Sequence, residues 1–83
     1  MQITVRYFAS IREAIGMGSE LVQTDAVDLA GLRDELLARS ASHAEALARG
    51  RAVRIAMNQV MCQESAALLA GAEVAFFPPV TGG

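Results

Sequence analysis

The sequence finishes with two glycines, Gly82 and Gly83, and an α-carboxylate at that position would have no side chains around it. The reference pKa of an α-carboxyl group is about 3.5, so the group is ionised at neutral pH. As an anion it can attack the α-phosphate of ATP and become an acyl-adenylate. Because glycines have no side chain, the pair can pass through a narrow channel into a partner. These residues therefore predict a chain that is activated at its own C-terminus and has no active site of its own.

The residues before the glycines support this interpretation. Pro78 and Pro79 follow an apolar run, and prolines have no N–H with which to continue a sheet. The six residues from Pro78 to Gly83 can span at most about 20 Å when extended, which is enough to enter a pocket of a partner. We therefore predict a folded domain over residues 1–78 and a flexible tail over residues 79–83. The plainer alternative is a frayed end without a function.

Composition limits the remaining classes of function. The 83 residues fit one domain, and the net charge of −2 argues against a nucleic-acid binder. A single cysteine, Cys62, excludes an intramolecular disulfide and a cysteine zinc cluster, and a lone thiol suits the cytoplasm. The first residues contain no long apolar run, so we expect neither a signal peptide nor a membrane span. We also expect no bound metal or cofactor.

The strands and helices that position the tail can be predicted from polarity patterns. Alternating or β-branched segments predict strands at residues 2–8, 19–24, 53–57, 60–63 and 74–77. Leucines at helical spacing predict a main helix over residues 28–40, with Asp25 or Asp28 as its N-cap. Shorter helical turns are expected after a capping box at residues 10–13, around residues 44–48, and at Leu68 and Leu69. The predicted class is α+β, with about five strands packed on one main helix.

One face of this sheet is predicted to carry an apolar patch. Phe8 and Phe77 have the opposite parity to Tyr7 and Phe76, so they should lie on the outer face, where Met61 joins them. Together with Pro78, Pro79, Val80 and Thr81, these residues are predicted to bind a partner. The alternative is a bulge that shifts the parity and buries them. A run of cations at Arg49, Arg51 and Arg54 resembles a basic cluster, but a helix C-terminus explains it as well.

Three segments resemble a known family. The ending Gly-Ala-Glu-Val-Ala-Phe-Phe-Pro-Pro-Val-Thr-Gly-Gly over residues 71–83, the start over residues 5–13 and the strand over residues 55–59 are similar to the MoaD family, the small sulfur-carrier subunit of molybdopterin synthase. The resemblance covers essentially the whole chain, and the Phe-Phe-Pro-Pro-Val-x-Gly-Gly ending is its most specific part. Ala72 departs from the pattern, because the family commonly has Asp there.

The resemblance implies a β-grasp, or ubiquitin-like, fold and a specific chemistry. An E1-like enzyme would use ATP to adenylate Gly83, and a sulfur donor protein would convert it to a thiocarboxylate. The tail would then deliver sulfur to cyclic pyranopterin monophosphate in the large synthase subunit, within a heterotetramer. Gly82 and Gly83 would thus be the catalytic residues of a chain that is part of an enzyme but is not catalytic on its own.

Other functions with the same ending stay open. A thiocarboxylate carrier of thiamine synthesis or tRNA thiolation would also end in Gly-Gly on the same fold. A ubiquitin-like modifier of protein lysines is a third possibility, and the absence of Lys means that it could not form chains on itself. The fourth is a binding module with an idle tail.

Overall fold

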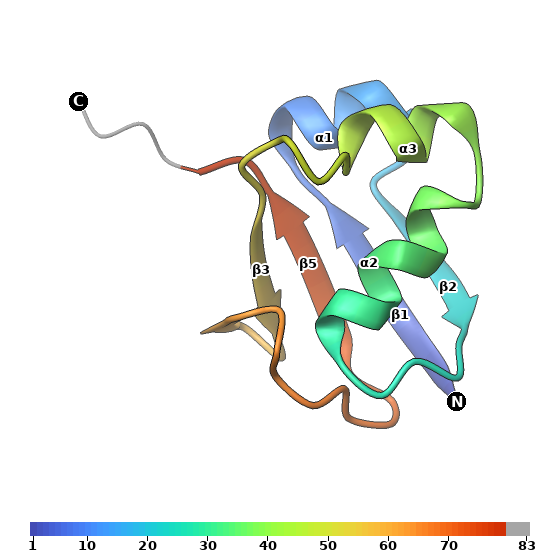
Figure 1. The fold of residues 1–83 in the computed structure, drawn as a ribbon, viewed down its shortest axis with the longest axis vertical. Coiled ribbons are helices and arrows are strands. Elements are labelled where there is room, and N and C mark those ends of the chain that lie inside the picture. The colour runs from blue at the N-terminus through green and yellow to red at the C-terminus, as the bar shows by residue number, and fades with distance from the viewer. Residues whose placement is uncertain (80–83) are drawn as a thin grey trace.

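The computed structural model describes residues 1–79, which form a five-stranded mixed sheet with helices packed against it (Figure 1). The strands lie in the order β2-β1-β5-β3-β4; β1 and β5 are parallel and the other pairs are antiparallel. The elements are β1 (Gln2–Tyr7), α1 (Ala9–Ile15), β2 (Ser19–Gln23), α2 (Leu29–Leu37), α3 (Ala41–Ala46), β3 (Arg54–Met57), β4 (Val60–Cys62) and β5 (Glu73–Phe77). The predicted α+β class and the five predicted strands are confirmed.

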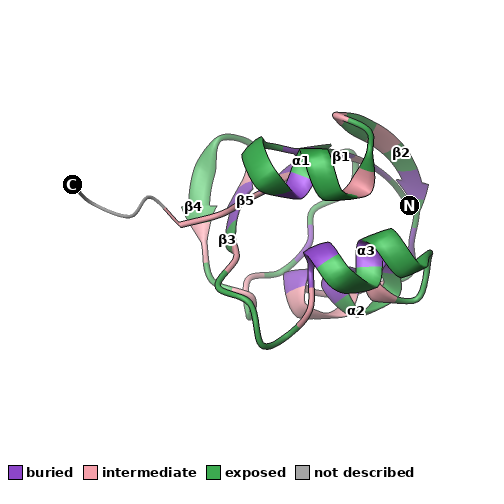
Figure 2. Ribbon diagram, turned by 90° about the horizontal axis from the view of Figure 1, so that it is seen from above, coloured by how far each residue is buried: buried purple, intermediate pink, exposed green. Residues whose placement is uncertain are grey.

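The core lies between the inner face of the sheet and the helices. Alternate residues of the two central strands point inward, as the polarity pattern of β1 predicted. The fully buried side chains are Ile3, Val5, Tyr7, Val22, Leu29, Leu32, Leu36, Leu47, Val74 and Phe76. Buried residues of α1 and α3 lie on the sides of these helices that face each other (Figure 2). Burial of each large side chain contributes about 1.5–3 kcal/mol to folding, so this small domain depends on all of them.

The helix boundaries differ from the prediction in two places. The main helix predicted over residues 28–40 ends earlier, because α2 stops at Leu37. The short turn predicted around residues 44–48 is the separate helix α3, which begins after Ser40, whose hydroxyl accepts a hydrogen bond from the His43 N–H. The predicted start of α2 is confirmed: Asp28 Oδ1 accepts from the Gly31 N–H at 2.8 Å. The predicted capping box is wrong, because α1 begins at Ala9 and therefore includes Ser10. Gly16 ends α1, with a φ of +90°.

The segment between β4 and β5 is not helical. The predicted turn at Leu68 and Leu69 is wrong, because this stretch pairs with the chain before α2: Ala67 bridges to Asp28, and the Leu68 N–H donates to the Val27 carbonyl at 3.0 Å. A tight turn follows, in which the Ala72 N–H donates to the Leu69 carbonyl and Gly71 has a φ of +74°. Backbone pairing with a distant segment thus replaces the local helical pattern.

Candidate functional site

The described chain ends where β5 leaves the middle of the sheet. β5 lies between β1 and β3, and after Phe77 the half-buried Pro78 and Pro79 cannot donate to either neighbour (Figure 1). Pro78 lines a shallow hollow that also contains Ser10, Ile11, Ala46, Arg51, Ala52 and Val53. The predicted boundary after residue 78 is next to this exit, and the division into a folded domain and a tail stays a prediction. Val80, Thr81, Gly82 and Gly83 lie outside the described residues, so the roles predicted for them stay predictions.

The aromatic residues beside the exit lie on the outer sheet face. The rings of Phe8 and Phe77 are 6.5 Å apart and nearly perpendicular. β5 keeps an unbroken register with both neighbours, since Phe76 pairs with Tyr7 and with Ile55. No bulge shifts the parity within β5, so Phe77 points away from the core, as predicted.

Met61 shares this face with Phe77. It pairs with Ala56, which in turn pairs with Ala75 of β5, two residues before Phe77. The two alanines between them have small side chains, so the side chains of Met61 and Phe77 protrude above the part of the sheet that separates them. Met61 is 48% exposed and Phe8 is 38% exposed. We call Phe8, Met61 and Phe77 the outer patch; its geometry suits contact with another protein, and its predicted docking role stays a prediction.

A buried polar cluster lies on the opposite side of β1. The Tyr7 hydroxyl donates to Glu20 Oε2 at 2.7 Å, and His43 Nε2 lies 2.7 Å from the same oxygen. Arg39 donates to the other carboxylate oxygen at 3.0 Å, and the Ser40 hydroxyl lies 2.7 Å from His43 Nδ1. Each buried polar side chain therefore has a partner, and the cluster connects β1, β2 and α3.

The ionisation of this cluster suits a structural role. Burial, followed by the hydrogen bond to Glu20, raises the pKa of Tyr7 far above its usual value, so the phenol stays protonated. Burial alone would raise the pKa of Glu20, but hydrogen bonds from His43 and Tyr7 and the charge of Arg39 leave it below the usual value. The carboxylate is thus held ionised between its donors.

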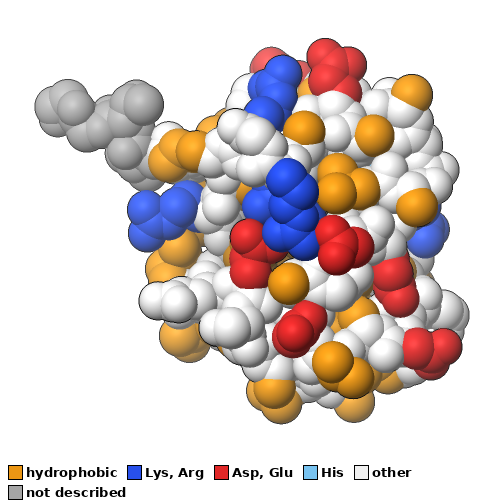
Figure 3. All heavy atoms as spheres, in the orientation of Figure 1, with side chains coloured by type: hydrophobic (Ala, Val, Ile, Leu, Met, Phe, Trp, Pro, Cys, Tyr) orange, Lys and Arg blue, Asp and Glu red, His pale blue; other side chains and the backbone are white. Residues whose placement is uncertain are grey.

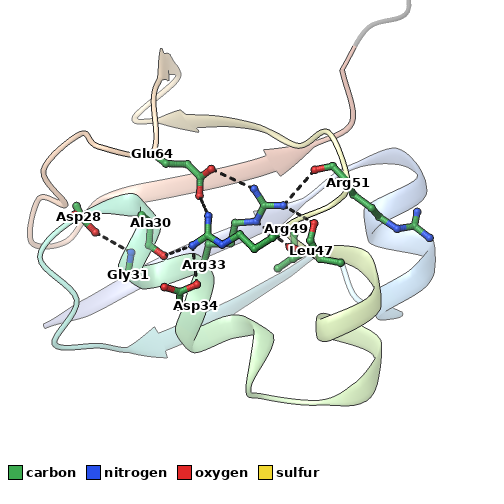
Figure 4. A network of polar contacts seen from close by, with 10 residues as sticks. Asp28, Ala30, Gly31, Arg33, Asp34, Leu47, Arg49, Arg51 and Glu64 are labelled. Carbon is green, nitrogen blue, oxygen red and sulfur yellow. Dashed lines mark hydrogen bonds and ion pairs between the residues drawn. The ribbon is translucent and has the colours of Figure 1, made fainter.

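A second polar network connects α2 to two distant loops (Figure 4). Arg33 is only 3% exposed; its Nε donates to the Leu47 carbonyl and its Nη2 to the Ala48 carbonyl, both at 2.8 Å. It also contacts the Arg51 carbonyl and Glu64, each at 3.4 Å. The helical periodicity did not reveal this role, because a charged residue beside Leu32 is normally read as a surface residue.

Arg49 completes the network on the surface. It donates to the Ala30 carbonyl at 3.0 Å and to Asp34 at 2.6 Å, and it also contacts Glu64. Figure 3 shows basic and acidic side chains next to one another in the middle of the face that it draws. The run of cations at Arg49, Arg51 and Arg54 is therefore not a single cluster, because Arg49 is bound to acidic residues.

The described residues contain no group of possible metal ligands and no helix that could span a membrane. Within residues 1–79, no three His, Cys, Asp or Glu side chains come together in a way that could hold a metal ion. In the same range no helix has the length and apolar character to cross a membrane.

Comparisons with known proteins agree with this geometry. The model of the ThiS family matches residues 5–83. Over 81 residues the chain is 41% identical to the molybdopterin synthase sulfur carrier subunit of Escherichia coli (strain K12), with 98% of this chain and 99% of that protein covered. A chain in the protein–protein complex of subunit 1 and 2 of molybdopterin-converting factor from Helicobacter pylori 26695 is 27% identical, with a TM-score of 0.70 and complete coverage of both chains. SAMP1 from Haloferax volcanii is 26% identical, with a TM-score of 0.77 and complete coverage of both chains.

Proposed function

The chain belongs to the ThiS family, and from this premise we propose that it is the sulfur-carrier small subunit of a molybdopterin synthase. The observation that carries the proposal is the 41% identity, over almost the full length of both chains, with a relative of that name. Its β-grasp fold agrees, because two solved structures that cover the whole chain match it with TM-scores of 0.77 and 0.70. The described exit of β5 beside the outer patch gives the C-terminal residues a fixed point of departure.

The proposed reaction begins at the carboxylate of Gly83. In an E1-like activating enzyme, a carboxylate oxygen attacks the α-phosphate of ATP, and pyrophosphate leaves. A persulfide sulfur of a donor protein then attacks the acyl carbon, AMP leaves, and a thiol reductant cleaves the resulting acyl disulfide to give the thiocarboxylate. In the large synthase subunit the thiocarboxylate sulfur bonds to cyclic pyranopterin monophosphate, and water then cleaves the acyl C–S bond, which leaves the sulfur on the pterin and returns Gly83 to a carboxylate. ATP is consumed by the activating enzyme, and this chain keeps no cofactor.

The residues of this chain have distinct parts in that scheme. Gly82 and Gly83 form the reacting end, whose lack of side chains admits it to the pockets of two different enzymes. The outer patch, Pro78, Pro79, Val80 and Thr81 bind the large subunit, and two small subunits flank a dimer of large ones. The chain is thus a protein cosubstrate within a sulfurtransferase complex. We place the reaction in the cytoplasm, where the lone Cys62 thiol stays reduced.

A second candidate is a ubiquitin-like modifier of other proteins. The observation that favours it is the likeness to SAMP1 over the whole chain, a protein whose Haloferax volcanii structure also carries the name small archaeal modifier protein 1. A modifier would use the same adenylation but would finish as an amide on a lysine of its target. The two functions therefore differ in the product formed at Gly83.

The intact mass of the protein tests the proposal. We expect incubation with the activating enzyme, ATP and a sulfur source to add the mass difference between sulfur and oxygen, confined to the C-terminal peptide. The large subunit should then convert cyclic pyranopterin monophosphate to molybdopterin with this product. A variant that lacks Gly83 is the control and should gain no mass. An unchanged mass with an enzyme shown to adenylate another carrier would contradict the proposal, and lysine conjugates in its place would establish the modifier.

A further inference from the structure

We propose that Arg6, Arg51 and Arg54 form a basic rim around the exit of β5 and pair with Asp and Glu side chains around the opening of the large synthase subunit. This inference rests on the proposed function, because it assumes that the large subunit receives the tail. It adds a second kind of contact to the apolar outer patch. The rim would speed the encounter between the two proteins and orient the tail toward the opening.

The three arginines surround the exit from different segments. Arg54 is the cross-strand partner of Phe77, the last residue of β5. Arg51 lines the same hollow as Pro78. The guanidinium of Arg6 lies 5.1 Å from the centre of the Phe8 ring, and that ring contacts Phe77. Basic side chains also lie beside the end of the described chain in Figure 3.

These arginines differ from the others in their partners. Arg33, Arg39 and Arg49 form ion pairs with distances of 3.4, 3.0 and 2.6 Å. Within residues 1–79, Arg51 and Arg54 have no ion pair, and Arg6 reaches Glu73 only at 3.9 Å. Arg12 is also without an ion pair in that range, but its side chain lies against Gly18 in the connection from α1 to β2. In a chain with a net charge of −2, two of the three arginines without an ion pair in residues 1–79 thus lie where the tail begins, and Arg6, with one long ion pair, lies beside them.

The structure holds Arg51 in position from the interior. The buried Arg33 donates to the carbonyls of Leu47, Ala48 and Arg51, which fixes the loop between α3 and β3. The Arg51 side chain itself points away from this network (Figure 4). A fixed backbone lowers the entropy lost when an exposed side chain forms an ion pair across an interface. Arg51 is therefore more suitable for docking than an arginine on a free loop.

Geometry favours a protein carboxylate over a substrate phosphate as the partner of the rim. Residues 78–83 can span about 20 Å, so the rim remains outside a pocket into which Gly83 reaches. Guanidinium groups bind carboxylates with two parallel hydrogen bonds, which fixes orientation as well as attraction. Charges at the edge of an interface act mainly on the association rate and on its dependence on salt. The rim should therefore act before the sulfur transfer.

The rate of association with the large subunit tests the rim. The Arg51→Gln/Arg54→Gln double variant is compared with Gln23→Glu/Gln59→Glu, which lowers the net charge by the same amount at exposed positions away from the exit. We expect the arginine variant to associate about ten-fold more slowly at low salt, with a weaker dependence on salt. The control should keep the rate of the unaltered protein. Thermal unfolding of both variants shows whether the fold is retained.

The outcomes separate the rim from the proposed function. If the unaltered protein binds the large subunit and both variants associate equally fast or equally slowly, the rim is overturned and the proposed function stands. If the unaltered protein does not bind the large subunit at all, the proposed function fails and the rim fails with it. A selective loss in the arginine variant, with unchanged sulfur loading by the activating enzyme, supports the rim.

Discussion

The ring of Phe8 contacts the ring of Phe77 edge to face, with the centroids 6.5 Å apart and the planes at 85°. Phe8 directly follows β1 and Phe77 ends β5, so this contact joins the ends of two parallel central strands. The Phe8 N–H also donates to the Phe76 carbonyl at 3.1 Å. The exit of β5 is thus held by backbone and side-chain contacts while part of both rings stays accessible to a partner.

Replacement of Phe77 by Asp should weaken binding to the large subunit. Phe77 lies in the centre of the outer patch, and loss of an aromatic residue at an interface centre costs about 2 kcal/mol or more. Leu21→Asp is the matched control, because Leu21 is 62% exposed on the same sheet face but on the edge strand β2. Isothermal titration measures both affinities. An equal loss in the two variants would show that the outer patch is not the docking site.

Replacement of Arg33 by Met should destabilise the fold. The change leaves the buried Leu47 carbonyl and the partly buried Ala48 carbonyl without their donors, and we expect a loss of about 3 kcal/mol in the free energy of unfolding. Arg49→Met is the control: its side chain is 43% exposed, and surface ion pairs contribute at most about 1 kcal/mol. Urea unfolding compares them. Similar losses of unfolding free energy in the two variants would mean that the buried hydrogen bonds of Arg33 stabilise the fold no more than the exposed contacts of Arg49 do.

Acid should weaken the fold through Glu20. Its pKa is lower in the folded protein than the ordinary 4.5, so the folded state binds fewer protons than the unfolded chain in this range. The stabilisation is therefore complete above pH 4.5 and is lost as the pH falls through the folded value. Glu20→Gln should reduce the slope of stability against pH on the acid side, relative to the exposed control Glu45→Gln. An unaltered slope would contradict the proposed charge interactions with His43 and Arg39.

Replacement of Gly71 by Ala should cost about 1 kcal/mol, because a residue with a Cβ is strained at a φ of +74°. Gly50→Ala is the matched control, since its φ is not positive and no atom lies within 4 Å of an added Cβ. Thermal unfolding gives both values. Equal melting temperatures would show that the turn before β5 relaxes at no cost.

Patterns that depend on near neighbours predicted much of this fold. Alternation placed Ile3, Val5 and Tyr7 in the core, and unbroken alternation in β5 placed Phe77 outside it. The Asp28 cap was found because a side-chain oxygen close in sequence satisfies the Gly31 N–H. Each of these features follows from a strand or helix period, and so the exit of β5 and its outer patch could be located from the sequence.

Features that depend on distant residues were missed. The Leu68 N–H pairs with Val27, forty-one residues earlier, and this contact overrides the local helical pattern. Arg33 is buried because carbonyls fourteen and more residues away accept its hydrogen bonds. The Ser10 capping box fails because α1 already begins at Ala9, directly after the Phe8 contact with β5. No periodicity in the sequence contains this information.

Replacement of Gly83 by Ala, or its deletion, should abolish sulfur transfer and leave folding unchanged. The buried core of the described residues is made of side chains between Ile3 and Phe76, and neither change alters any of these side chains. The added methyl group, or the shortened chain, changes the group that must enter the adenylation pocket. Gly50→Ala introduces the same methyl group elsewhere and should keep full activity. The measurement is molybdopterin formation with the large subunit, beside thermal unfolding. A Gly83 variant that still supports synthesis would mean that sulfur travels by another group, and the carrier function proposed for this chain would have to be abandoned.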